Sequence, residues 1–151
     1  MFTDPKLILM IGIPGSGKSA WLYDNNFKVV VSPDLIRKEM FGDITDQSHN
    51  NEVWEEAKSR TIDYLLKGIS VVIDATNVST SYRRMFVQDL PPCKLQAKIF
   101  NVGPVECCDR IKKDLETNKD RSTVPDEVVF RMYGEFLYTL RVIKSEGFEL
   151  I

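Results

Sequence analysis

The sequence has few of the residues that build disulfide frameworks or histidine-rich metal sites. Among its 151 residues there are three cysteines and a single histidine, His49. A small, odd number of cysteines argues against a set of disulfides and for a reducing compartment, so we expect a cytoplasmic protein. One histidine rules out a zinc site built from several histidines and leaves little room for a Ser-His-Asp triad.

The sequence also lacks long hydrophobic runs and an excess of charge of one sign. No apolar stretch approaches the roughly 20 residues of a membrane-spanning helix, and the first residues carry no secretory signal, so no membrane association is expected. Its 20 basic and 22 acidic side chains give a net charge of −2. This balance excludes a globally basic nucleic-acid-binding surface but leaves room for a local basic patch.

Apolar, strand-like runs alternate with amphipathic, helical patterns along the chain. The expected strands cover residues 6–11, 27–31, 69–73 and 95–102, with an edge strand within 147–151. The expected helices cover residues 18–24, 33–40, 51–67, 81–89, 104–115 and 126–140. Strands that alternate with helices form parallel sheets covered on both faces. We therefore expect a three-layer α/β/α fold over residues 1–151, with a mostly parallel sheet of four to five strands.

A glycine-rich motif follows the first expected strand and opens the first helix. Residues 12–19 read Gly-Ile-Pro-Gly-Ser-Gly-Lys-Ser, which fits the pattern G-x-x-x-x-G-K-[ST]. Glycines let backbone N–H groups converge on phosphate oxygens, and the positive end of the helix points at the same anion. The motif predicts a P-loop NTPase-type domain that binds ATP and Mg²⁺ through Gly12, Pro14, Gly15, Ser16, Gly17, Lys18 and Ser19. Lys18 would reach the β- and γ-phosphates, and the Ser19 hydroxyl would ligate Mg²⁺.

An acid and an arginine follow the second expected strand. Asp34 and Arg37 are three residues apart in the opening turns of a helix, so they share a helix face at the sheet edge where ligands bind. A kinase needs a carboxylate that takes the proton of an acceptor hydroxyl and a cation that holds an acceptor phosphate. Asp34 and Arg37 suit these roles. The alternative is an acid that complements the helix dipole and forms an ordinary ion pair.

The third expected strand ends in Asp74 and a polar turn. P-loop proteins place an acid at this position, near the metal or the acceptor, so Asp74 is a catalytic candidate. For Thr76 a helix-capping role is an equal alternative. Ala75 stands where many hydrolysing ATPases have a water-activating acid, which disfavours a motor or switch. In the next helix, Arg83 and Arg84 would each contact an acceptor phosphate or be solvated.

A charged segment near the C-terminus, residues 108–125, predicts a helical lid. It carries several lysines and arginines and ends in Val124-Pro125 between two helices. Arginines of a lid neutralise charge on a transferred phosphoryl group and exclude water. Because acids interleave with these cations, a solvated helix face is the alternative. The adjacent Cys107 and Cys108 are expected to be small packing residues.

Together these residues resemble the polynucleotide 5′-hydroxyl kinase family of phage and bacterial end-repair enzymes. The resemblance spans nearly the whole chain. Besides the P-loop, the residues that carry it are Ser32-Pro33-Asp34-x-x-Arg37, Asp74-x-Thr76-Asn77, Cys107-x-x-Arg110 and Val124-Pro125-x-Glu127. The resemblance implies that Asp34 is the general base on a 5′-hydroxyl. It also implies that Arg37 holds the 3′-phosphate of the acceptor and that Asp74 orders the acceptor side.

The resemblance further implies that lid arginines contact the phosphates of ATP. The family often has a second arginine four residues after the one that matches Arg110, but Asp114 occupies that position. We therefore assign Arg110 and Arg121 to ATP, with Arg121 facing the transferred phosphate. The phosphatase domain that often accompanies such kinases is not expected within these 151 residues, and no stable protein partner is predicted.

The expected reaction transfers the γ-phosphoryl group of ATP to a hydroxyl, with the 5′-hydroxyl end of DNA or RNA as the preferred acceptor. The catalytic residues would be Lys18, Asp34, Arg37, Asp74 and Arg121. Alternative acceptors are a nucleoside, a small metabolite and a hydroxymethylated base in phage DNA. An ATP-hydrolysing regulatory module is an alternative of a different class. The sequence does not choose between DNA and RNA.

Overall fold

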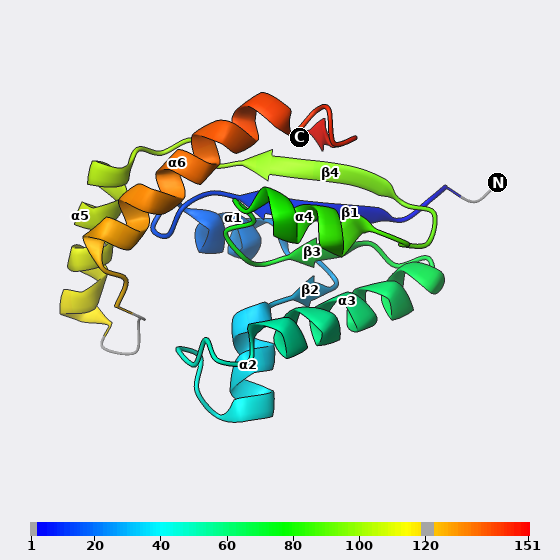
Figure 1. Ribbon diagram of the computed structural model, residues 1–151, viewed down its shortest axis with the longest axis horizontal. Coiled ribbons are helices and arrows are strands. Elements are labelled where there is room, and N and C mark those ends of the chain that lie inside the picture. Colours follow the sequence, from blue (N-terminus) through cyan, green and yellow to red (C-terminus); the bar gives the residue numbers. More distant parts are fainter. Residues whose placement is uncertain (1–2, 119–122) are drawn as a thin grey trace.

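The computed structural model describes residues 3–118 and 123–151, and within these ranges the chain forms five strands and six helices (Figure 1). The strands are β1 (Lys6–Ile11), β2 (Val30–Val31), β3 (Val71–Ile73), β4 (Lys94–Ile99) and β5 (Glu149–Leu150). The helices are α1 (Lys18–Asn25), α2 (Pro33–Phe41), α3 (Asn50–Leu66), α4 (Thr80–Val87), α5 (Pro104–Thr117) and α6 (Asp126–Val142). None of the described helices is long and apolar enough to span a membrane.

The five strands form one sheet in the order β2-β3-β1-β4-β5, and every described pair is parallel. Leu7 of the central strand lies opposite Val71 on one side and Leu95 on the other. The expected α/β fold with a parallel sheet is confirmed, including the edge strand near the C-terminus. β2 is shorter than the predicted run at 27–31, and Phe27 packs against Trp21 of α1, with ring centroids 4.9 Å apart.

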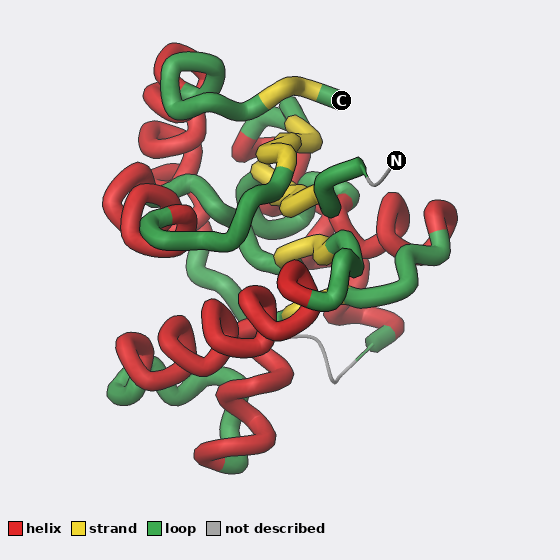
Figure 2. Tube along the Cα trace, turned by 90° about the vertical axis from the view of Figure 1, so that its right-hand side faces the viewer, coloured by secondary structure: helices red, strands yellow, loops and turns green. Residues whose placement is uncertain are grey.

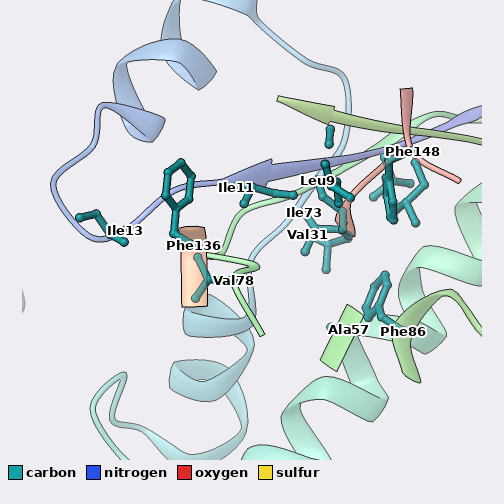
Figure 3. Close-up of a cluster of buried hydrophobic side chains, with 14 of the residues drawn as sticks. Leu9, Ile11, Ile13, Val31, Ala57, Ile73, Val78, Phe86, Phe136 and Phe148 are labelled. Carbon is teal, nitrogen blue, oxygen red and sulfur yellow. The ribbon is translucent and has the colours of Figure 1, made fainter. Parts of the chain in front are cut away.

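Helices cover both faces of the sheet, as the side view in Figure 2 shows. β1 is buried from Leu7 to Ile11, and its side chains alternate between two cores. Leu7, Leu9 and Ile11 join the larger core, which Figure 3 shows with side chains from α3, α4 and α6. Ile8 and Met10 join the smaller core beneath α1. Two-sided burial explains why the sequence of β1 is apolar without interruption.

The sheet topology brings the carboxyl ends of β1, β2 and β3 to one edge. β1 is central, and the chain leaves it for β2 and β3 on one side before it returns to β4 on the other. In open parallel sheets, ligands bind at the carboxyl edge where the strand order reverses. The P-loop follows β1, α2 follows β2, and the turn that begins at Asp74 follows β3. The predicted site residues on these three segments therefore share one edge.

Candidate active site

The P-loop wraps closely against α5. Gly15 has a φ of +83°, and a Cβ atom added there would lie 2.8 Å from the carbonyl oxygen of Cys107. Gly17 has a φ of +101° and caps α1. Both positions need glycine, since side chains rarely adopt these backbone angles. Cys107 and Cys108 are buried, which confirms their predicted packing role.

Lys18 folds back over the P-loop in this structure. Its ammonium donates hydrogen bonds to the carbonyl oxygens of Gly12 and Ile13, each at 2.9 Å. No side chain of the described residues caps the start of α1, and the first turn of a helix is where backbone N–H groups bind anions. Ser19, on the first turn, is exposed. The loop thus has the cation, the backbone donors and the hydroxyl of a triphosphate-binding site.

Asp34 and Arg37 share a helix face, as their spacing predicts, and they form the ion pair given above as the alternative to a catalytic role. Arg37 Nη1 lies 2.5 Å from Asp34 Oδ1, with the arginine side chain 5% exposed and the aspartate side chain 70% exposed. Ser32 caps α2 by accepting a hydrogen bond from the N–H of Leu35, which fixes the turn that carries Asp34. The acid therefore keeps an open carboxylate at the sheet edge while the arginine is held below it.

Arg37 is also held by a residue that the sequence analysis missed. Its Nη2 donates to Asn50 Oδ1 at 3.0 Å, and Asn50 is the first residue of α3. The two residues are 13 positions apart, so no helical spacing connects them, and only the packing of α2 against α3 brings them together. Arg37 Nε is buried and has no hydrogen-bond partner among the described residues. A buried, unpaired guanidinium donor is costly, and an anion bound there would satisfy it.

Asp74 lies between the P-loop and α2. Its N–H donates to the carbonyl oxygen of Val31 at 2.9 Å. Burial raises the pKa of Asp74, the Lys18 ammonium opposes this shift, and the Asp34 carboxylate adds to it. The two neighbours act because their charges lie close to Asp74. The structure thus brings together Lys18, Asp34 and Asp74, which come from three separate segments.

The turn after Asp74 is tied to the end of β1. Gly12 N–H donates to the carbonyl oxygen of Thr76 at 3.1 Å, and the Asn77 side chain donates to the carbonyl oxygen of Met10 at 2.7 Å. The suggested capping role for Thr76 is wrong, because Ser79 is the N-cap of α4 and accepts from the N–H of Tyr82. Thr76 instead joins the turn to the P-loop through its backbone.

Arg83 differs from both of its predicted roles, acceptor contact and solvation. Its residue is 2% exposed, and Nε and Nη2 donate to the two carboxylate oxygens of Glu146 at 3.0 and 2.9 Å. The remaining donors bind the carbonyl oxygen of Asn77 and the hydroxyls of Thr80 and Thr139. Arg83 is therefore a buried structural residue that links α4 to α6 and to the turn after β3. Arg84 is exposed, in line with the solvated alternative.

Arg110 lies beside the P-loop, while its predicted contact with ATP stays a prediction. Its Nη1 donates to the carbonyl oxygen of Gly15 at 3.3 Å, and its Nη2 donates to Glu106 at 2.8 Å. The segment predicted as a lid begins as regular helix, since α5 continues to Thr117. Arg121 lies outside the described residues, so its contact with the transferred phosphate stays a prediction, as does lid closure.

Comparison with known proteins places this site in a family. Residues 7–137 match the family described as AAA domain. The chain belongs to this AAA domain family. Its fold is also similar to that of the Mycobacterium tuberculosis APS kinase CysC, solved with AMPPNP and APS. That likeness has a TM-score of 0.56 at 18% identity, over 76% of this chain and 72% of the kinase.

Two further similar chains come from RNA repair assemblies. A chain of the Pnkp1/Rnl/Hen1 RNA repair complex is 25% identical, with a TM-score of 0.78 over 93% of this chain and 47% of that chain. A chain of a second Pnkp1/Rnl/Hen1 complex structure is 29% identical, with a TM-score of 0.61 over 73% of this chain and 40% of that chain.

These matches confirm the resemblance that the motifs indicated. The protein spans less than half the length of the two similar chains. Both chains belong to complexes, so they do not support the expectation that no stable protein partner exists.

Proposed function

We propose that this protein transfers the γ-phosphoryl group of ATP to the 5′-hydroxyl end of a DNA or RNA strand. The observation that carries the proposal is the convergence of Lys18, Asp34 and Asp74 at the carboxyl edge of the sheet. Phosphoryl transfer needs positioning and charge stabilisation more than covalent catalysis. A P-loop lysine beside two carboxylates on the acceptor side supplies both.

ATP would bind with its β- and γ-phosphates in the P-loop. Lys18 already points its ammonium into the loop, where it binds the carbonyl oxygens of Gly12 and Ile13, and phosphate oxygens would take their place. Arg110, at the carbonyl oxygen of Gly15, is close enough to the loop to reach a bound phosphate. The AMPPNP in the similar APS kinase structure supports a nucleotide at this position.

The site also fits a Mg²⁺ ion. Mg²⁺ on nucleotides takes one or two protein ligands, and phosphate oxygens and waters complete its shell. The exposed Ser19 hydroxyl beside Lys18 would be such a ligand, whereas no group of three potential metal-binding side chains occurs in residues 3–118 and 123–151. Bound there, Mg²⁺ would neutralise charge on the β- and γ-phosphates.

The acceptor would approach from the side of α2. The exposed Asp34 carboxylate would orient the 5′-hydroxyl and take its proton as the 5′-oxygen bonds to the γ-phosphorus. The bond from that phosphorus to the oxygen bridging to ADP breaks in the same step. The unpaired Nε of Arg37 would donate to the 3′-phosphate of the terminal nucleotide. A buried arginine with an unpaired hydrogen-bond donor favours an acceptor that carries a phosphate over a simple alcohol.

Transfer of labelled γ-phosphate from ATP to a panel of acceptors tests the proposal. The panel holds single-stranded and duplex DNA and RNA with 5′-hydroxyl ends, nucleosides, nucleoside 3′-phosphates, and end-blocked DNA with hydroxymethylated bases. Label on 5′-ends is expected. Lys18→Ala and Asp34→Ala should each abolish it, while Asp34→Ala retains ATP binding.

Other outcomes of this assay distinguish the alternatives. Label on nucleosides or internal bases alone would identify these groups as the substrate in place of a 5′-end. ATP hydrolysis that no acceptor stimulates would indicate a regulatory module. Arg37→Lys should raise KM for nucleoside 3′-phosphates more than for nucleosides, because a lysine lacks the fork that spans Asp34, Asn50 and the phosphate.

A further inference from the structure

An aromatic pair joins α4 to α3, the helix whose first residue, Asn50, holds Arg37. The ring of Trp54 on α3 stacks on that of Tyr82 on α4, with centroids 5.6 Å apart and planes at 20°. Phe86 contacts Trp54 edge to face, with ring centroids 5.9 Å apart and planes at 85°. Trp54 thus covers one face of the Tyr82 ring, yet Tyr82 remains 37% exposed. A rigid ring with solvent on its outer side can accept another flat ring.

The pair is connected to Arg37 through α3. Asn50 accepts the hydrogen bond of Arg37 Nη2 and begins α3. Trp54 is four residues further along, so it lies on the same helix face, about 6 Å away between Cβ atoms. Lys58, one turn later still, donates to the backbone carbonyls of Met85 and Gln88. These bonds hold α3 and α4 side by side, as Figure 1 shows.

We propose that Trp54 and Tyr82 form the binding site for the base of the second nucleotide of the acceptor strand. This inference rests on the proposed function, in which Arg37 holds the phosphate that joins the first and second nucleotides. The base beyond that phosphate would stack on the face of Tyr82 that Trp54 does not cover. Stacking is tolerant of sequence, because every base has a π-face, so the site would accept any base.

The stacking site gives a reason for an acceptor longer than one nucleotide. The net charge of −2 argues against a long electrostatic track for the backbone. An aromatic platform holds single-stranded nucleic acid without such a track, at about 1–3 kcal/mol per stacked base, or roughly 5- to 150-fold in affinity. The preferred acceptor is therefore a single-stranded 5′-end of at least two nucleotides.

Two acceptors test this site in the protein. One is a nucleoside 3′-phosphate, which reaches only Asp34 and Arg37, and the other is a short single-stranded oligonucleotide with a 5′-hydroxyl. Tyr82→Ala should lower kcat/KM about tenfold or more for the oligonucleotide and less than twofold for the nucleoside 3′-phosphate. Tyr82→Phe keeps the ring and should restore the oligonucleotide rate. Tyr23→Ala, which removes an 88% exposed tyrosine of α1, is the matched control and should change neither rate.

An oligonucleotide that lacks the second base completes a double-mutant cycle. The wild type should phosphorylate this oligonucleotide with the same low kcat/KM that Tyr82→Ala shows for the intact oligonucleotide. Tyr82→Ala and removal of the second base should together lower kcat/KM no more than either change alone, because each removes the same contact. Additive losses, or equal losses for both acceptors in Tyr82→Ala, would overturn the stacking site while the kinase activity stands. Failure of the wild type to phosphorylate any 5′-hydroxyl would overturn the proposed function and this inference with it.

Trp54 offers an independent readout of binding. The chain has two tryptophans, Trp21 and Trp54, so Trp21→Phe leaves Trp54 as the single reporter. Its fluorescence should be quenched by the oligonucleotide and much less by the oligonucleotide without the second base. Equal quenching by both would contradict stacking at this position.

Discussion

Replacing Glu146 with alanine is predicted to lower the free energy of unfolding by about 3–5 kcal/mol, the cost of removing one partner of a buried ion pair. Glu146 accepts two hydrogen bonds from Arg83, and the side chains are 11% and 1% exposed. The guanidinium cannot lose its proton. In the variant, a full positive charge therefore stays buried with two of its five donors unpaired.

This loss is large against the stability of an ordinary domain, about 5–15 kcal/mol. The three remaining donors of Arg83 still bind Asn77, Thr80 and Thr139, but all three acceptors are neutral. With a urea slope of about 2 kcal/mol per molar, the midpoint of unfolding should fall by roughly 2 M. Because Asn77 lies in the turn that begins at Asp74, we also expect slower phosphoryl transfer.

Urea unfolding followed by circular dichroism measures the loss. Glu39→Ala is the control, because it removes an exposed ion pair, in which the side chain of Glu39 is 59% exposed and that of Arg60 is 38% exposed. Exposed ion pairs contribute about 0–1 kcal/mol to stability. Replacing both Arg83 and Glu146 with methionine and leucine should recover much of the stability, since the unpaired charge is gone. The reasoning fails if Glu146→Ala costs no more than Glu39→Ala.

Two further substitutions test the P-loop and the carboxylate behind it. Gly15→Ala should cost about 1–3 kcal/mol and weaken ATP binding, because the residue has a φ of +83° and the new Cβ would lie 2.8 Å from a carbonyl oxygen of α5. Gly134→Ala in α6, where nothing lies within 4 Å, should instead stabilise the protein by up to about 1 kcal/mol, and thermal unfolding of both variants decides. Burial raises the pKa of Asp74, so the native state holds that proton more tightly than the unfolded chain and loses stability as the pH rises. Asp74→Asn should therefore unfold at higher urea concentration than the wild type at pH 7, with the gap closing as the pH falls below the ordinary value of 3.8. A wild type at least as stable as the variant at pH 7 would contradict this account.

Local patterns in the sequence were sufficient for the scaffold of the site. The apolar run of β1, the glycines after it and the start of α1 are neighbours in the chain, so their spacing alone predicted the phosphate-binding loop. Asp34 and Arg37 are three residues apart, and helical geometry alone predicted their contact. The parallel sheet followed from strands that alternate with helices.

Contacts between distant segments could not be predicted in this way. Arg83 was expected to contact an acceptor phosphate or to be solvated, but a glutamate 63 positions away neutralises it in the interior. Arg110 meets the P-loop across 95 positions, and Trp54 meets Tyr82 between two helices. Periodicity reports which face of an element is buried, but not which other element covers that face. The sequence alone therefore determined the fold class and predicted the glycine-rich loop between β1 and α1. Only tertiary packing decided that Arg83 is structural, that Asn50 holds Arg37, and that Trp54 stacks on Tyr82.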